Sequence, residues 1–478
     1  MIISVCIVGV YSQSCPEQCV CRFSKITCSG ETSSLTKFPE IESENWIRVI
    51  EVVNTNITSL QEGNVILPTV PRLIQLSLYS NGIKTLNNSM FVNNTLIEKL
   101  SLHNNILQFI PSNSFKPLKN LVYIDLGRNE IQVIESNAFM ENKNLEFISL
   151  KLNAIRDVHP LTFNGLINLT TLDLSFNNIS EFPIGRLQHH LSNLRYLTIG
   201  NNFLLDIQTT DQGLESCQQL VLESNLITTL QNFSLIGFPN LFSLFLISNF
   251  ITRIDPYIFG SSEHPLVVLN LGNNNLEDLP VFLFRNLPLL RHLYLQNNKI
   301  TTVPKEAFVK NSFLQNLDLS SNTIHTCHPL SLQGLTNLRT LKLSYNNLTD
   351  LSVEMFDSSF ESRIWFYGNY WRCDCKMYDI QQRFKVNPEL ILGMTCFDPI
   401  DERGVDVMKV MFVKYCGDQP DVTMTLSTTD AAFSSDNDAL FHDVIFFIFG
   451  VVIVARLIIL LSGFGRSRRV FLWKSCAA

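Results

Sequence analysis

The stretch Leu121-Val122-Tyr123-Ile124-Asp125-Leu126-Gly127-Arg128-Asn129-Glu130-Ile131 recurs in outline along the chain of 478 residues. Its frame is L-x-x-L-x-L-x-x-N-x-I/L, and the asparagines of successive copies are 23 to 25 residues apart. Leucines at alternate positions form one face of a short strand, and a single strand cannot bury that face alone. We therefore expect the copies to stack into one parallel sheet over a shared core. The asparagines are Asn81, Asn105, Asn129, Asn153, Asn177, Asn202, Asn225, Asn249, Asn274, Asn298, Asn322 and Asn346.

A frame of this kind at this period is typical of a leucine-rich repeat. It predicts an α/β repeat fold, a right-handed solenoid or horseshoe with a parallel concave β-sheet. A buried carboxamide donates and accepts, so we expect the asparagine column to satisfy backbone groups at each turn. A second apolar column follows ten residues after the asparagines and predicts a stacked spine under the convex side, with an irregularity at Gln212. Its members are Phe91, Phe115, Phe139, Phe163, Phe259, Phe284, Phe308 and Phe356, with Leu187, Leu235 and Leu332.

The totals and motifs exclude several classes of function. The net charge of −7 argues against nucleic acid as a partner. The chain has no H-E-x-x-H, no G-x-S-x-G and no phosphate-binding glycine loop. His189 and His190 precede a strand and are expected in solvent. We therefore expect no catalytic residues, no cofactor and no metal, and hence no enzyme.

The two ends of the chain are apolar. Residues 2–10 are followed by small residues, which predicts a signal peptide over 1–14 cleaved before Cys15. Residues 444–461 are apolar except for Arg456, which predicts a transmembrane helix over 444–464. Basic residues after this span predict a cytoplasmic tail over 465–478. We expect a single-pass protein of the plasma membrane with its N-terminus outside the cell.

Arg456 is a lone charge inside the predicted span and has two interpretations. Its side chain can snorkel to the cytoplasmic headgroups, or it can pair with an acidic residue of a partner's transmembrane helix, which would act as an adaptor. Residues 417–443 are rich in Thr, Ser and Asp and carry no repeat, so they predict a flexible stalk.

Ten cysteines lie between the predicted signal peptide and the predicted stalk. Four precede the repeats and four follow them, where a solenoid needs covers for its open ends. Four cysteines can pair in three ways, so spacing leaves the connectivity open. Zinc is the competing interpretation, although an extracellular context favours disulfides. Cys217 and Cys327 fall on apolar positions of the repeat and are expected to be buried, unpaired and inert.

These two clusters resemble the cysteine-rich flanks of extracellular leucine-rich-repeat proteins, a group that includes platelet glycoprotein Ib, Slit, the Nogo receptor and the large subunit of carboxypeptidase N. The resemblance rests on Cys15-Pro16-Glu17-Gln18-Cys19-Val20-Cys21 and on Asn369-Tyr370-Trp371-Arg372-Cys373-Asp374-Cys375, although the family usually has Pro in place of Tyr370. It implies caps over 15–46 and 363–416 around about 13 repeats over 47–362. It also implies four disulfides: Cys15–Cys21, Cys19–Cys28, Cys373–Cys396 and Cys375–Cys416. It selects no ligand, because such proteins share a scaffold and differ in partners.

Residues that point outward from the strands are the third, fifth and seventh of each frame. Most are polar, but four consecutive repeats carry apolar ones, which predicts an exposed patch that binds a protein ligand. Self-association and a merely apolar sheet are the alternatives. The patch residues are Val221, Phe245, Ile247, Val268 and Tyr294, rimmed by Glu223, His292 and Gln296. Seven N-glycosylation sequons avoid these positions: Asn56, Asn87, Asn93, Asn168, Asn178, Asn232 and Asn347.

The sequence thus favours a cell-surface receptor or adhesion protein that binds an extracellular protein, or a second copy of itself, on its concave face. A non-catalytic carrier or regulatory subunit of another protein is the first alternative. An innate-immune pattern-recognition receptor is the second.

Overall fold

The computed structural model describes residues 15–416, except 17–18, 31–34, 36–37, 42–45, 56, 58–66, 88, 188–189, 208–212 and 357–360. The predicted signal peptide, stalk, transmembrane helix, Arg456 and cytoplasmic tail lie outside the described residues, as do Asn56, His189 and Gln212. In the described part of the chain no helix is long and apolar enough to cross a membrane. All described residues belong to one compact unit, Met1–Gly417.

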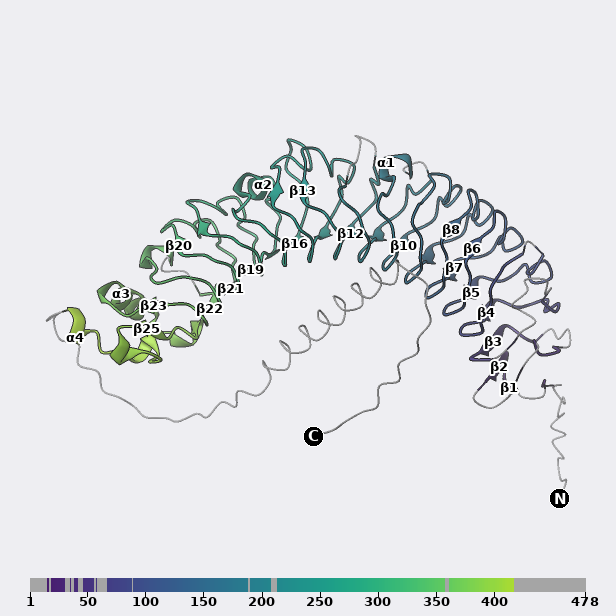
Figure 1. Cartoon of the computed structure of the whole chain (residues 1–478), viewed down its shortest axis with the longest axis horizontal. Helices are drawn as coiled ribbons and strands as arrows, with labels where there is room; N and C mark the ends of the chain where they lie inside the picture. The colour runs from purple at the N-terminus through teal and green to yellow at the C-terminus, as the bar shows by residue number, and fades with distance from the viewer. Residues whose placement is uncertain are drawn as a thin grey trace, which may run out of the picture. The chain divides into compact units, whose positions relative to one another are not determined.

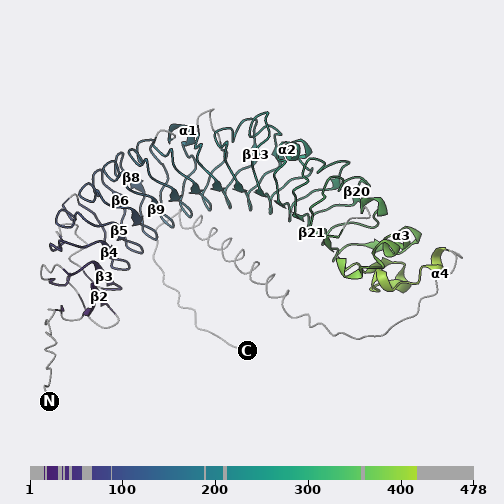
Figure 2. The same cartoon turned by 180° about the vertical axis from the view of Figure 1, so that it is seen from behind.

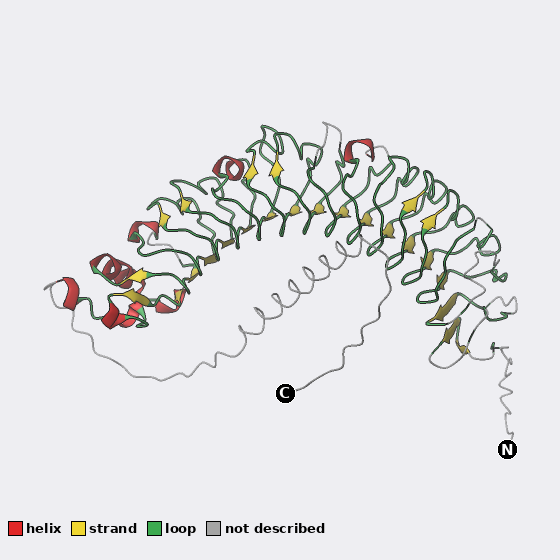
Figure 3. Ribbon diagram, viewed as in Figure 1, coloured by secondary structure: helices red, strands yellow, loops and turns green. Residues whose placement is uncertain are grey.

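This unit is a solenoid with one continuous sheet along its concave side (Figures 1, 2 and 3). Within the described ranges the sheet has 17 strands, all parallel except β1, which is antiparallel to β2. The strands are β1 (Cys19–Arg22), β2 (Lys25–Ser29), β3 (Val49–Val53), β4 (Gln75–Ser77), β5 (Lys99–Ser101), β7 (Tyr123–Asp125), β9 (Phe147–Ser149), β10 (Thr171–Asp173), β11 (Tyr196–Thr198), β12 (Gln219–Val221), β14 (Ser243–Phe245), β16 (Val268–Asn270), β17 (His292–Tyr294), β19 (Asn316–Asp318), β21 (Thr340–Lys342), β22 (Arg363–Trp365) and β24 (Ile391–Leu392).

The sheet keeps the register of the sequence frame. Leu100 pairs with Ile124 and Ile124 with Ile148, and all three side chains are fully buried. Where one step is 25 residues long, Asp173 still pairs with Thr198, so the extra residue is accommodated outside the strands. A slip of one residue would turn every inward leucine to solvent, which explains why the register holds.

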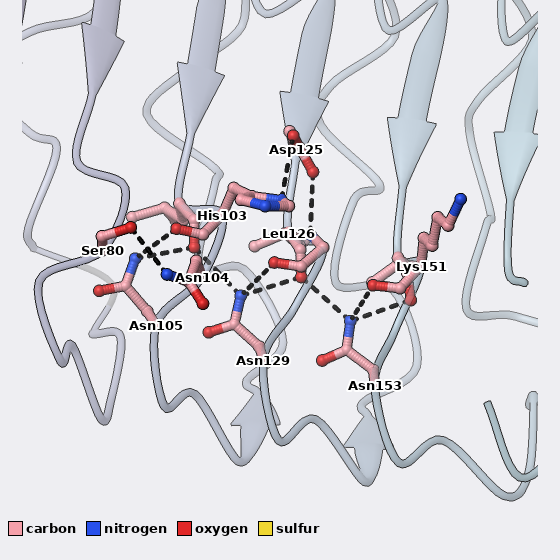
Figure 4. A network of polar contacts seen from close by, with 12 residues as sticks. Ser80, His103, Asn104, Asn105, Asp125, Leu126, Asn129, Lys151 and Asn153 are labelled. Carbon is pink, nitrogen blue, oxygen red and sulfur yellow. Dashed lines mark hydrogen bonds and ion pairs between the residues drawn. The ribbon is translucent and has the colours of Figure 1, made fainter. Parts of the chain in front are cut away.

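The predicted asparagine ladder is present (Figure 4). The Asn129 side-chain amide donates to the carbonyls of Leu102 at 3.1 Å and Leu126 at 2.9 Å. Its carbonyl accepts the backbone N–H of Leu107 at 3.1 Å. The ladder continues into the C-terminal cap, where Asn369 accepts from the backbone N–H of Leu348. Each turn of the solenoid is therefore tied to the next through buried backbone groups.

The predicted phenylalanine spine is also present. Phe115 stacks on Phe91 and Phe139, with ring centroids 6.2 and 5.5 Å apart, and Phe284 stacks on Phe308 at 5.6 Å. The convex side around it is made of turns, short helices and two-residue strands. The outer strand pairs are β6 (Phe109–Ile110) with β8 (Val133–Ile134), β13 (Thr229–Leu230) with β15 (Arg253–Ile254), and β18 (Thr302–Val303) with β20 (Thr326–Cys327). The helices among the repeats are α1 (Ile184–Leu187), α2 (Val281–Arg285) and the 3-10 turn η2 (Val353–Met355).

The C-terminal cap closes the core with aromatic side chains. Trp371 is fully buried and lies edge-on to Phe366 at 5.2 Å. Asp374 caps helix α3 by accepting from the backbone N–H of Lys376, and Phe384 of α3 packs edge-on against Phe356. The elements of the cap are β23 (Trp371–Arg372), α3 (Cys375–Phe384), η3 (Pro388–Leu390), β25 (Cys396–Asp398), η4 (Ile400–Glu402), η5 (Val407–Lys409) and α4 (Val413–Cys416).

The cysteines follow the pairing that the resemblance implied: Cys15–Cys21, Cys19–Cys28, Cys373–Cys396 and Cys375–Cys416 are disulfides. Cys217 and Cys327 are free, and burial raises the pKa of each thiol to about 12. Cys217 is buried as predicted. Cys327 is only half-buried on β20, which corrects the prediction, although it still packs against the core.

Candidate ligand-binding face

The side chains of the concave sheet stand in three rows that cross the strands. We call the first residue of each three-residue strand the leading row, the third residue the middle row, and the residue two positions further the trailing row. On β14 these are Ser243, Phe245 and Ile247. Because pairing is in register, residues of one row on adjacent strands are direct neighbours.

The structure brings together three of the five predicted patch residues. Val221 pairs directly with Phe245 in the middle row, and Ile247 follows Phe245 on the same strand. Tyr294 is in the middle row too, but Asn270 of β16 stands between it and Phe245. Val268 lies in the leading row between Ser243 and His292.

The patch is therefore a cluster of Val221, Phe245 and Ile247, with Val268 and Tyr294 set apart from it. On β16 the apolar side chain, Val268, stands in the leading row, and the middle-row position between Phe245 and Tyr294 is held by Asn270. All five side chains are half-buried.

Three aromatic side chains that the sequence analysis did not single out extend the apolar surface. Tyr123 of β7 and Phe147 of β9 are stacked in the leading row, with ring centroids 4.6 Å apart and planes at 5°. Tyr196 of β11 is in the same row and is 43% exposed. Thr171 of β10 separates it from Phe147. We call Tyr123, Phe147 and Tyr196 the aromatic row. Burial, and then the charge of Asp125, raise the pKa of Tyr123.

Glycines in the trailing row leave notches that neighbouring side chains enter. A Cβ on Gly200 would lie 2.8 Å from Cγ of Glu223, and one on Gly272 would lie 2.5 Å from Nε2 of Gln296. Glu223 and Gln296, two of the three predicted rim residues, therefore each lie over a glycine. Burial raises the pKa of Glu223, an effect that Lys151 partly offsets. Burial, and then the charge of Arg291, lower the pKa of the third predicted rim residue, His292.

A hollow of about 360 Å³ opens in the trailing row between β5 and β9. Its lining residues are His103, Asp125, Gly127, Arg128, Ser149, Lys151 and Leu152. A wider hollow of about 780 Å³ is formed by outer turns and holds none of the predicted patch residues. The described residues contain no group of three or more His, Cys, Asp or Glu side chains that could hold a metal ion.

The six described sequons lie outside the concave strands. Asn87 shows how one of them can be modified. Its carbonyl oxygen accepts from the backbone N–H and the hydroxyl of Ser89, both at 2.9 Å, while its amide nitrogen, the atom that a glycan would use, makes no hydrogen bond to the described residues. Glycosylation of these sites stays a prediction.

Comparison with known sequences identifies the repeats. The leucine rich repeat family matches residues 95–155, 143–204, 264–324 and 312–359. Leucine-rich repeat-containing protein 3 of Danio rerio is 31% identical over 151 residues, which cover 31% of this chain and 47% of that protein. The human leucine-rich repeats and immunoglobulin-like domains protein 3 is 34% identical over 112 residues, 23% of this chain and 10% of that protein. The matches thus span less than half of either relative.

Comparison with solved structures identifies the same fold. A chain of the Toll–Spatzle complex of Drosophila superposes with a TM-score of 0.63 at 21% identity, over 79% of this chain and 56% of that one. A chain of the TLR13–ssRNA13 complex gives 0.56 at 22% identity, over 77% and 60%. A leucine-rich-repeat protein of Leptospira interrogans gives 0.57 at 21% identity, over 76% and 93%. At identities this low, the superpositions show a shared fold and leave the ligand open.

Proposed function

The chain is a leucine-rich-repeat protein with a disulfide-bonded cap at each end of its solenoid, and we propose that it is a non-catalytic cell-surface receptor or adhesion protein that binds a protein ligand on its concave face. The predicted signal peptide and the predicted transmembrane helix over 444–464 support the cell-surface part of this proposal. The disulfides support it further, since such bonds persist in oxidising compartments.

The main observation in favour of the concave face as the binding surface is its set of outward-facing apolar side chains. The aromatic row and the cluster of Val221, Phe245 and Ile247 place aromatic and aliphatic side chains on the outward side of one rigid sheet, from β7 to β14. The core does not need them there, because the inward leucines already fill it. Aromatic side chains are enriched where proteins bind other proteins, so these positions fit a protein ligand. The complex of a similarly folded chain with Spatzle is compatible with this class of partner.

Site-specific photo-crosslinking in cells that express the full chain tests the proposal. A photoreactive phenylalanine analogue replaces Phe245 or Tyr196 on the concave face. In the control it replaces Phe282 of α2 on the convex side, which is 65% exposed. We expect Phe245 and Tyr196 to crosslink the same partner protein and Phe282 to miss it. The double variant Phe245→Ser/Ile247→Ser should abolish the crosslink from Tyr196 while the protein still reaches the cell surface.

The assay also separates the alternatives. A crosslinked species of twice the chain's mass would identify the face as an interface between two copies, and hence homophilic adhesion. Equal labelling from Phe282 and Phe245 would remove the concave face from consideration. Surface biotinylation of the same cells checks the location, and a chain found only inside the cell would refute the cell-surface proposal.

A further inference from the structure

The hollow beside Gly127 exists because the trailing row has a glycine at this position. Its neighbours in that row are His103 on one side and Lys151 on the other, both long side chains, and Gly127 between them has no side chain. A Cβ on Gly127 would lie 3.0 Å from both Oδ1 of Asp125 and Nδ1 of His103, and 3.3 Å from the Lys151 carbonyl oxygen. The volume of the hollow therefore depends on the glycine.

The charges around the hollow are unbalanced. Asp125 is its one carboxylate, and it is already engaged, since Oδ1 accepts from the backbone N–H of Gly127 at 2.9 Å. Arg128 and Lys151 form no ion pair with any residue that the structure describes; the Lys151 ammonium lies 5.3 Å from the centre of the Phe176 ring. Arg128 and Lys151 thus line the hollow beside one carboxylate, and the Lys151 ammonium rests over Phe176 of the following coil without an ion-pair partner among the described residues.

His103 adds a polar atom that needs a partner. Its Nδ1 is shielded from solvent and makes no hydrogen bond to the described residues; Oδ2 of Asp125 is 3.5 Å away, a contact that is an ion pair only when His103 is protonated. That separation is too long for a good hydrogen bond. Figure 4 shows the His103 ring next to the Asp125 carboxylate, with Lys151 on the next coil and its side chain directed away from them. The Ser149 hydroxyl completes the polar lining.

We propose that this hollow is a subsite for the carboxylate of an Asp or Glu side chain on the protein ligand. This inference rests on the proposed function of the concave face and names the chemistry of one contact. An acidic group there would accept from Lys151, Arg128 and Ser149, and charge-assisted bonds of this kind are the stronger ones. A hollow of about 360 Å³ has room for one acidic side chain.

The strands that carry the hollow also carry the stacked pair of Tyr123 and Phe147. Four residues separate Tyr123 from Gly127, which is roughly 13 Å along extended backbone. A ligand segment that runs along β7 could therefore place an apolar side chain on the rings and an acidic one in the hollow. Two such contacts at fixed spacing would give the concave face a preferred ligand orientation.

A sulfated polysaccharide is the competing anion, and the surroundings disfavour it. Such a polymer needs a stripe of cations, whereas the next strands beyond the hollow present Asp173 in the middle row and Glu223 in the trailing row. The net charge of −7 also opposes a polyanion. A single acidic side chain meets only the local pair of cations.

The test measures binding of poly-L-glutamate, with heparin as the second probe, to the immobilised full chain at low ionic strength. We expect Arg128→Gln/Lys151→Gln to weaken poly-L-glutamate binding at least tenfold. Gly127→Ala, which narrows the hollow, should weaken it as well. The matched controls are Arg339→Gln/Lys342→Gln, with the same change of charge, and Gly200→Ala, a glycine of the same row. Lys342 already pairs with Asp318 at 3.3 Å, so this control should change affinity less than twofold.

Equal losses in the two charge variants would overturn the proposal, because the probe would then sense only net charge. Tighter binding of heparin through the same residues would overturn it in favour of a sulfated ligand. Crosslinking from Phe245 does not use the hollow, so the two proposals fail separately. If Arg128→Gln/Lys151→Gln binds the crosslinked partner as tightly as the parent chain does, the hollow is no subsite and the concave receptor stands.

Discussion

Replacement of Asn129 by Ala isolates the contribution of one rung of the asparagine ladder. The side-chain amide of Asn129 donates to the carbonyls of Leu102, Leu126 and Gly127, but each of these carbonyls has a second donor. Leu102 also accepts from Asn105, Leu126 from Asn153, and Gly127 from the backbone N–H of Asn104. The backbone N–H of Leu107 has no such substitute, since its partner is the Asn129 carbonyl.

The expected loss follows from this inventory. One buried N–H without a partner costs about 1–3 kcal/mol, and the shared bonds that disappear add on the order of 1 kcal/mol. We therefore expect Asn129→Ala to lower the free energy of unfolding by about 2–4 kcal/mol. The control is Asn144→Ala, which removes an exposed bond from the same residue type to the carbonyl of Lys119 at 3.1 Å. Water can replace that bond, so the control should lose less than about 0.5 kcal/mol.

Urea denaturation followed by tryptophan fluorescence measures both variants. Amide hydrogen exchange at Leu107 locates the effect, since coils of a solenoid can open locally before the whole array unfolds. Exchange at Leu107 should accelerate in Asn129→Ala and stay unchanged in Asn144→Ala. Equal losses in the two variants, or an unchanged exchange rate at Leu107, would refute the claim that the ladder stabilises the solenoid through its single-partner N–H groups.

Three further predictions concern the core. Phe139→Ala should cost about 3–5 kcal/mol in urea denaturation because its ring stacks on both spine neighbours, whereas Phe282→Ala on the surface should cost under about 0.5 kcal/mol. Burial lowers the pKa of His264, so the unfolded chain binds more protons below about pH 6.5 and stability should fall as pH drops through that value. His264→Asn can keep the bond to the Phe238 carbonyl and should flatten the pH profile of thermal unfolding. An unchanged profile would show that other groups cause the pH dependence. Cys217, with a thiol pKa raised to about 12, should resist iodoacetamide at pH 8 until the protein is denatured, as peptide mass spectrometry would show.

The sequence predicted those parts of the fold that recur in every repeat. Inward leucines, the asparagine ladder and the phenylalanine spine each serve the same contact in successive coils, so their spacing is visible in the chain. A second set of polar contacts recurs only in some repeats and was missed. Asn142 and Asn311 bond to carbonyls of the preceding coil, and His264 takes the same role toward Phe238. Asn142 and Asn311 both stand 13 residues after a ladder asparagine, but half of the other ten copies have Leu or Phe at that position, so the polar contact does not show as a repeating residue type.

The grouping of the predicted patch residues was predicted only in part, because it depends on rows as well as repeats; that they bind a ligand stays a prediction. Apolar residues in four consecutive repeats suggested one patch, but Val268 falls in the leading row and Phe245 in the middle row. Val268 therefore lies diagonally from Phe245, whereas Val221 pairs with Phe245 directly. The frame position of each residue carries this information. The frame positions of Tyr123 and Phe147 likewise place both residues in the leading row, as direct neighbours.

The two sides of each strand have different roles, which explains why residues of the concave face can vary at low energetic cost. Inward residues such as Ile124 are fully buried, and their replacement would open a cavity in the shared core. The side chains of outward residues contact other residues of the same face, as Asp125 contacts Gly127 and His103, so a glycine, a cation or an aromatic ring can occupy these positions while the register is kept. Gly127 is the extreme case, since it contributes no side chain and instead leaves room between His103 and Lys151. A solenoid held by its inward face can therefore change its ligand through the outward one, and the residues that deviate from the polar pattern of that face are where a ligand should be sought.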